Sequence, residues 1–200
     1  AKKTKKEADP IVWDLDRKSF NPAVDDFLKD VTNVWKDTER LRNNLALDYS
    51  INQTWVKAAN GVVFKIVTFP DKNGNRVSTT DIQKAINSSI EGGAAIQNNA
   101  KLALVGLPGA TVGLMNLTKV DDMTYFGKYV KSAKAALDQC SKEAKSIVEM
   151  KNDELELIQS YIKKSVNVGP YKSTARVIIL QQEAGDVVPA TMQSLESFNF

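Results

Sequence analysis

Apolar residues between positions 122 and 167 recur at alternating steps of three and four. The stripe begins with Phe126, Val130, Ala133, Leu137, Cys140, Ala144 and Ile147. This spacing places one apolar face on an α-helix. Farther along the chain the stripe moves round to Leu155, Ile158 and Ile162, as a 3.6-residue period does against a strict heptad. The pattern therefore predicts a long central helix over 122–167, which needs packing partners along its length.

A second helical pattern begins at Asn21-Pro22. Asparagine is a favourable N-cap, proline suits the first helical position, and the acidic residues that follow favour the positive end of the helix dipole. The three-four spacing then continues through Val24, Phe27, Val31, Val34, Thr38, Leu41 and Leu45. We expect a first long helix over 22–59, ended by Asn60-Gly61.

Between these two helical patterns, the stretch 62–79 has the character of strands and a turn. A β-branched and aromatic run is followed by an Asn73-Gly74 turn and then by a second short extended run. These features predict a small β-hairpin over 62–79. Thr80 then opens a capping-box spacing, which predicts a further helix. Near the other end of the chain, the pattern of 174–183 fits a strand and a short helix equally well.

The stretch 102–118 contains no charged residue, and glycine and proline interrupt its apolar positions. Its large apolar residues are Leu102, Leu104, Val105, Leu107, Val112, Leu114, Met115 and Leu117. One use for this stretch is a buried helix-turn-helix corner, where glycine lets two backbones approach closely. The other use is contact with a partner or a membrane, since Lys101 and Lys119 flank the run, which at 17 residues is at the short limit for a helix that spans a bilayer. A segment masked in a bundle that inserts later is loosely similar to the apolar head of helical pore-forming toxins.

The net charge of +3 is concentrated in the first residues of the chain. A flexible basic arm is expected over 1–10, and its cationic residues are Lys2, Lys3, Lys5 and Lys6. Without this arm the chain is near neutral, which argues against duplex nucleic acid as the main partner. The arm suits three roles: a solvated terminus, a weak contact to nucleic-acid phosphates, and a weak contact to an anionic surface.

The composition excludes several kinds of chemistry. The chain has no histidine, which removes the usual general base, the imidazole metal ligands and the Ser-His or Cys-His nucleophile pairs. Its one cysteine, Cys140, lies on the apolar stripe and is expected to be a core residue. We therefore predict no enzyme activity, no cofactor, no metal and no small-molecule substrate.

Two short motifs imitate chemical sites. Asp14-Leu15-Asp16 resembles the nucleophile motif of haloacid-dehalogenase phosphatases, but Arg17 follows where that family has a small residue. Asp71 opens a calcium-loop spacing, but Arg76 stands where that loop requires glycine. Both motifs are interpreted as turns with solvated acids.

These patterns together predict a mainly α protein, an elongated helical bundle with two long antiparallel helices, shorter helices and a small β-hairpin. A single domain is expected over 11–200, with an irregular tail at 185–200. The chain shows no signal-peptide pattern, and its cysteine usage is compatible with the cytoplasm, although the compartment is not fixed by the sequence.

For function, the sequence favours a non-catalytic structural or assembly subunit. It would act through helix-mediated, coiled-coil-like contacts, either by self-association or with a protein partner. The first alternative is a membrane-active helical protein that inserts 102–117. The second is a weak nucleic-acid or anionic-surface binder that acts through the lysine-rich arm.

Overall fold

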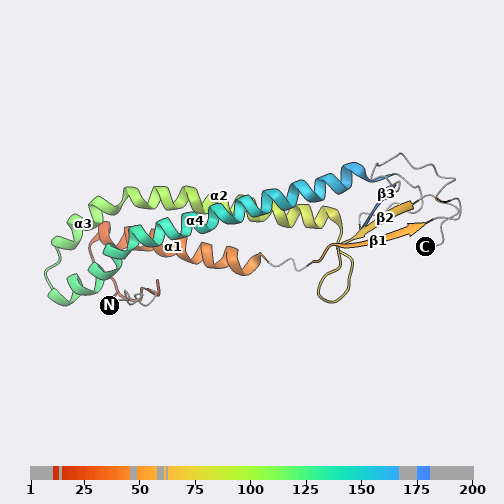
Figure 1. The fold of residues 1–200 in the computed structure, drawn as a ribbon. Coiled ribbons are helices and arrows are strands. Elements are labelled where there is room, and N and C mark those ends of the chain that lie inside the picture. The colour runs from red at the N-terminus through yellow and green to blue at the C-terminus, as the bar shows by residue number, and fades with distance from the viewer. Residues whose placement is uncertain are drawn as a thin grey trace, which may run out of the picture. The chain divides into compact units, whose positions relative to one another are not determined.

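The computed structural model describes residues 11–13, 15–45, 49–57, 61, 63–166 and 175–180. Helices make up 68% of the described residues, and the strands among them form one small antiparallel sheet (Figure 1). This confirms the predicted class, mainly α with a small β element. The chain divides into two compact units, residues 1–43 with 92–146 (unit 1) and 44–91 with 147–200 (unit 2). A single domain over 11–200 stays a prediction.

The predicted central helix is present as α4, Val120–Lys164, and its bounds lie within a few residues of the prediction. The stripe residues Phe126, Leu137 and Ala144 are buried, as the spacing requires. The other long helix is α2, Thr79–Val105, which packs closely against α4 and runs in the opposite direction (Figure 1).

The first helix, α1, spans Pro22–Asn44. Its start is as predicted, because Oδ1 of Asn21 accepts hydrogen bonds from the backbone N–H groups of Ala23 (3.1 Å) and Val24 (3.3 Å). The predicted extension to residue 59 is wrong. Residues Asn52–Lys57 form strand β1 instead, because pairing with a neighbouring strand overrides the local helical pattern.

The sheet has the order β1-β2-β3, with β2 at Val63–Thr68 and β3 at Arg176–Leu180. Both pairings are antiparallel: β1 lies beside β2 from Asn52↔Thr68 to Lys57↔Val63, and β3 lies on the other side of β2. The ambiguous stretch 174–183 therefore contains a strand.

The predicted hairpin over 62–79 needs a correction. The partner of β2 is β1, and the residues after the Asn73-Gly74 turn contribute only an isolated bridge from Arg76 to Pro70. The turn itself exists, with Gly74 at φ 81°. Gly61, where φ is 86°, lies between β1 and β2 and does not end a helix.

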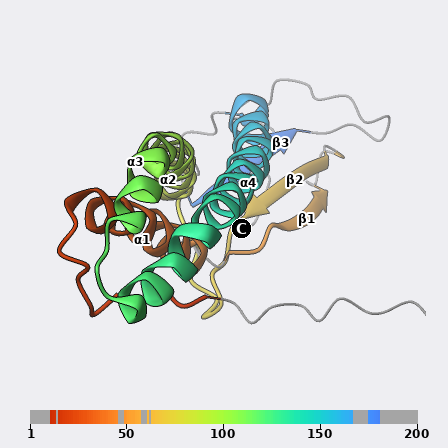
Figure 2. The same cartoon turned by 90° about the vertical axis from the view of Figure 1, so that its left-hand side faces the viewer.

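Each unit has its own apolar interior. In unit 2 the sheet packs against the start of α2 and the end of α4, and the buried residues are Val67, Phe69, Ile82, Ile86, Ile158, Val177 and Ile179. In unit 1 the end of α2 and the start of α4 lie beside α1, seen nearly end-on in Figure 2. The short helix α3, Leu107–Met115, joins α2 to α4 and packs on the start of α1.

Candidate interaction surface

The charge-free stretch 102–118, named here the apolar turn, comprises the end of α2, helix α3 and the connection into α4. Gly106 joins α2 to α3, and a Cβ atom at that position would lie 3.3 Å from the ring of Phe27 on α1. The amide of Ala110 then donates to the carbonyl oxygen of Gly106 at 3.0 Å and begins the helical bonding of α3. The sequence thus folds into a tight corner whose glycines allow close packing on α1.

The inner side of the apolar turn is buried. Ala103, Ala110 and Gly113 are the buried residues of this side. At Gly113 a Cβ atom would lie 2.6 Å from Oδ1 of Asn21 and 3.1 Å from Cγ2 of Val24. Only glycine permits this approach of α3 to α1, because real Cβ contacts of that length essentially do not occur.

The outer side of the apolar turn is exposed and still apolar. Leu102 is 62% exposed, Val105 77%, Val112 60% and Met115 75%. Four further predicted contact residues are half-buried: Leu104, Leu107, Leu114 and Leu117. A surface helix normally presents polar residues to water, whereas α3 has no charged side chain on any face. The corner therefore leaves all of its large apolar side chains at least partly exposed.

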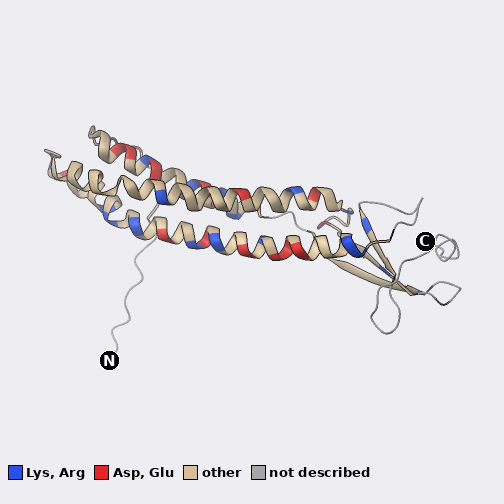
Figure 3. Ribbon diagram, turned by 90° about the horizontal axis from the view of Figure 1, so that it is seen from above, with Lys and Arg blue, Asp and Glu red and all other residues tan. Residues whose placement is uncertain are grey.

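Charged residues surround the apolar turn without entering it. In Figure 3 they recur along the long helices, while residues 102–118 contribute none. The exposed Lys101 and Lys119 flank the turn on either side. The exposed Asp121 follows, and Asp122 forms an ion pair with Arg17. The residues that directly precede and follow the apolar turn are therefore both basic.

Next to this turn, the segment before α1 doubles back along that helix. At one end Trp13 is buried, with its ring centroid 6.3 Å from that of Trp35 on α1 and 5.5 Å from that of Tyr129 on α4. At the other end, Asp25 accepts hydrogen bonds from the backbone N–H groups of Ser19 (2.8 Å) and Phe20 (3.0 Å). Both ends of the segment are therefore fixed to the helical core.

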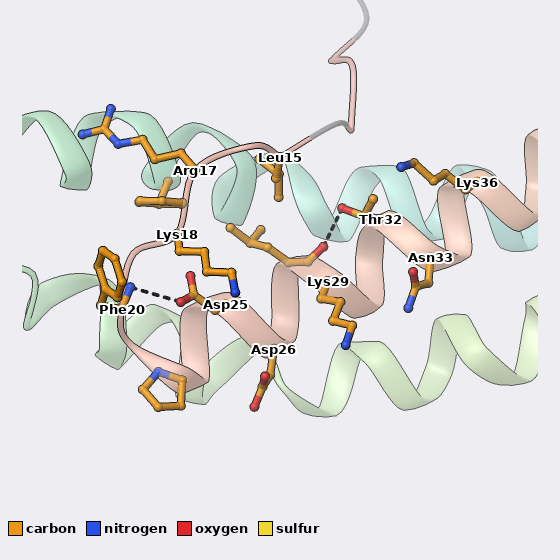
Figure 4. A pocket seen from close by; sticks show the side chains of 13 residues that line it. Leu15, Arg17, Lys18, Phe20, Asp25, Asp26, Lys29, Thr32, Asn33 and Lys36 are labelled. Atoms are coloured by element: carbon orange, nitrogen blue, oxygen red, sulfur yellow. Dashed lines mark hydrogen bonds between the residues drawn. The ribbon is translucent and has the colours of Figure 1, made fainter.

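An open cavity of about 530 Å³, named here the α1 groove, lies between this segment and α1 (Figure 4). Leu28 and Phe126 form a buried apolar floor. Cationic side chains stand at its rim, including the exposed Lys18 and Lys29. The guanidinium of Arg17 is already engaged, because it pairs with Asp122 and its Cζ lies 5.1 Å from the ring centroid of Tyr125.

Phe20 is the unusual residue of the α1 groove. Its side chain is 90% exposed, and its backbone adopts a left-handed conformation with φ 62°. Sequence reasoning missed it, since nothing local distinguishes this phenylalanine from a core residue. Its only sequence signal is its place directly before the Asn21-Pro22 helix start.

Cys140 and Asp71, two further residues identified in the sequence, lie in the part of the chain that the structure describes. Cys140 is buried, and burial raises the pKa of its thiol. Asp71 accepts hydrogen bonds from the backbone N–H groups of Asn75 (2.9 Å) and Asn73 (2.8 Å), as expected for a turn residue. These hydrogen bonds lower the pKa of the Asp71 carboxyl. Asp14 and the lysine arm, Lys2, Lys3, Lys5 and Lys6, lie outside the described residues.

Within the described part of the chain, no group of three or more acidic or cysteine side chains is placed to hold a metal ion. No helix in that same part is long and apolar enough to cross a membrane. Comparisons with protein-family models, with curated proteins and with solved structures found no match to this chain.

Proposed function

We propose that this chain is a non-catalytic protein that binds the surface of a lipid membrane through the apolar turn. One observation supports the proposal most strongly. The turn keeps large side chains exposed, Val105 and Met115 among them, over a stretch without any charge. Exposed apolar patches of this kind lower the free energy of the protein when they leave water.

Lipid suits this surface better than a protein partner does. Protein interfaces have polar rims and about one hydrogen bond for every 100–200 Å² of contact. The outer side of α3 offers no charged group and few polar ones, whereas the acyl boundary of a bilayer requires neither. Lys101 and Lys119 at its two edges complement the phosphates of an anionic membrane.

The depth of contact follows from the length of the helix. The nine residues of α3 extend for about 14 Å, roughly half the thickness of the hydrocarbon core. The turn therefore enters the interface and does not span the bilayer. Each exposed Val, Leu or Met side chain contributes on the order of 1 kcal/mol when partly inserted. Each flanking lysine adds about 1 kcal/mol at an anionic surface, so the binding is weak and reversible.

Vesicle co-sedimentation tests the proposal. Wild-type protein is expected to sediment with vesicles that contain anionic phospholipid, and Val112→Asp is expected to reduce the bound fraction at least tenfold. Val12→Asp is the matched control, because Val12 is also an exposed valine of unit 1, at 74% exposure, but lies outside the apolar turn. Equal binding by both variants, or no binding by the wild type, contradicts the proposal.

A second proposal, self-assembly into a structural subunit, rests on strand β1. It lies at the edge of the sheet, and most of its side chains are exposed, including Trp55 at 54%. Exposed edge strands are templates for pairing with another copy. Light scattering on a sizing column at low and high concentration tests this, and a constant mass of 22.1 kDa contradicts it.

Binding of nucleic acid by the lysine arm stays a prediction, since the arm lies outside the described residues.

A further inference from the structure

We propose that Phe20 and the rim of the α1 groove form a second lipid contact, which makes the protein prefer anionic phospholipids. In this contact the ring of Phe20 enters the interface, and Lys18 and Lys29 bind the phosphate of a lipid headgroup. The inference rests on the membrane binding proposed above, and it assigns a lipid class and a second set of residues to it.

The first argument is the strained backbone of Phe20. A left-handed conformation is unfavourable for a bulky residue, and glycine or asparagine adopts it far more easily. The strain is not compensated by packing, because the side chain is 90% exposed. It is maintained by Asp25, whose carboxylate binds the N–H groups of Phe20 and Ser19 and also the hydroxyl of Ser19 at 2.7 Å. The fold thus holds an aromatic ring in water, which suggests a role outside the folded core.

The second argument is the position of Phe20 beside the apolar turn. The next residue, Asn21, donates a hydrogen bond from Nδ2 to the carbonyl oxygen of Gly113 in α3 at 3.4 Å. Phe20 is therefore one residue away from the contact between α1 and α3. The start of α1 and helix α3 thus lie at the same end of unit 1 (Figure 1).

The third argument is the charge of the groove. Figure 4 shows Lys29 and Lys36 projecting from α1 two turns apart, with Lys18 on the facing segment. Two carboxylates also line the groove, and Asp25 keeps its negative charge because its three hydrogen bonds come from uncharged donors. The three lysines that line the groove therefore outnumber its two carboxylates.

The shape of the groove suits a lipid headgroup region. Its apolar floor can receive the glycerol and upper acyl atoms, while lysines on the rim meet the phosphate. An aromatic ring at the same level is typical of the membrane–water interface. A soluble phosphate would contact only the lysines, whereas a phospholipid would also contact the ring of Phe20. Substitution of Phe20 therefore distinguishes the two ligands.

Phe20→Gly is the central test. Glycine accepts the positive φ, so the variant is expected to unfold at the same temperature as wild type or higher, while its binding to anionic vesicles falls about tenfold. A residue with a purely structural role would not show this opposite behaviour. Phe20→Asn is the second variant, because asparagine also adopts the left-handed conformation and should lose the same binding.

Val12→Gly is the matched control. Val12 is an exposed apolar residue of the same segment. It lies far from Phe20, because its neighbour Trp13 packs on Trp35, which is about 20 Å along α1 from the start of that helix. Its binding should equal that of the wild type. The headgroup contact is tested by Lys18→Gln combined with Lys29→Gln, which should lower binding to anionic vesicles about tenfold and leave only the smaller preference that Lys101 and Lys119 provide.

The outcomes separate the two proposals. If wild type binds and Val112→Asp does not, but Phe20→Gly and Phe20→Asn bind as wild type does, the second contact is refuted and the apolar turn stands. If the double lysine variant binds anionic vesicles as tightly as wild type does, the headgroup assignment is refuted. If wild type binds no vesicles, both proposals fail.

Discussion

The side chain of Asn21 connects two helices. Its Oδ1 caps the start of α1, and its Nδ2 donates to the carbonyl oxygen of Gly113 in α3 at 3.4 Å. A Cβ atom at position 113 would lie 2.6 Å from that Oδ1. The cap of one helix is thus also the packing surface for the other.

Gly113→Ala is therefore expected to destabilise the protein by about 1–3 kcal/mol, because the methyl group displaces the Asn21 cap. Urea unfolding followed by circular dichroism measures the change. Gly109→Ala is the control on the same helix, since a Cβ atom there meets nothing within 4 Å. That variant should be more stable by about 0.5–1 kcal/mol. Equal losses in the two variants would show that α3 does not pack on α1 as described.

Asp25→Ala is expected to destabilise unit 1 by about 1.5–3 kcal/mol. The change leaves the N–H groups of Ser19 and Phe20 without their charged acceptor. Thermal unfolding measures the loss. The neighbouring Asp26→Ala, which alters an exposed carboxylate, should change the stability by less than about 0.5 kcal/mol. A similar effect from both variants would mean that only the charge at the helix start matters.

The ion pair between α1 and α4 gives a pH-dependent prediction. Nε of Arg42 donates to Oε1 of Glu143 at 2.5 Å, and Nη2 donates to Oε2 at 2.8 Å. The hydrogen bonds from Arg42 lower the pKa of the Glu143 carboxyl. Since the folded pKa is lowered, the stabilisation is fully present above the pKa of an unfolded glutamate, about 4.3. It is lost as the pH falls through the lowered pKa of the folded state.

Glu143→Gln should therefore be less stable than wild type at pH 6, by at most about 1 kcal/mol because the pair is partly exposed. The difference should disappear near the acid end of a urea-unfolding series from pH 7 to pH 3. Asp138→Asn, an exposed carboxylate on the same helix, is the control. A difference that stays constant with pH would mean that the variant acts through packing.

The thiol of Cys140 is expected to react slowly in the folded protein. It is 3% exposed, and burial raises the pKa of the thiol, so little thiolate is present at pH 8. Labelling with a thiol reagent should accelerate about a hundredfold or more in 8 M urea. Thr111→Cys on the exposed side of α3, in a Cys140→Ala background, should react rapidly without denaturant. Rapid labelling of Cys140 in the native protein would contradict the buried position.

Local signals explain how much of the fold was predictable. The three-four spacing and the cap at Asn21 lie within a few residues of the elements that they specify, so α4 and the start of α1 were predicted correctly. The strand pairing of the sheet, in contrast, could not be predicted from local patterns. Strand β2 pairs with β3, which comes from the far end of the described chain, and no local pattern specifies such a partner. The pairing of β1 with β2 likewise places a strand where the predicted extension of α1 would lie.

The candidate site was predictable only in part. The absence of charge from 102 to 118 identified the apolar turn, but not which of its side chains face water. Exposure depends on which face α1 covers, and that is decided at Gly106 and Gly113. Phe20 could not be found, because its exposure follows from a hydrogen bond to Asp25 and not from its own neighbours in sequence.

The central position of β2 has a consequence for the order of events on the ribosome. Every residue of unit 1 has been synthesised by position 146, whereas β3 begins only at Arg176. Unit 1 can therefore complete its core first, while one edge of β2 waits for its partner for roughly 5–20 s of translation, at about 5–20 residues per second. In that interval the nascent chain presents an open strand edge, where premature pairing with another copy can begin.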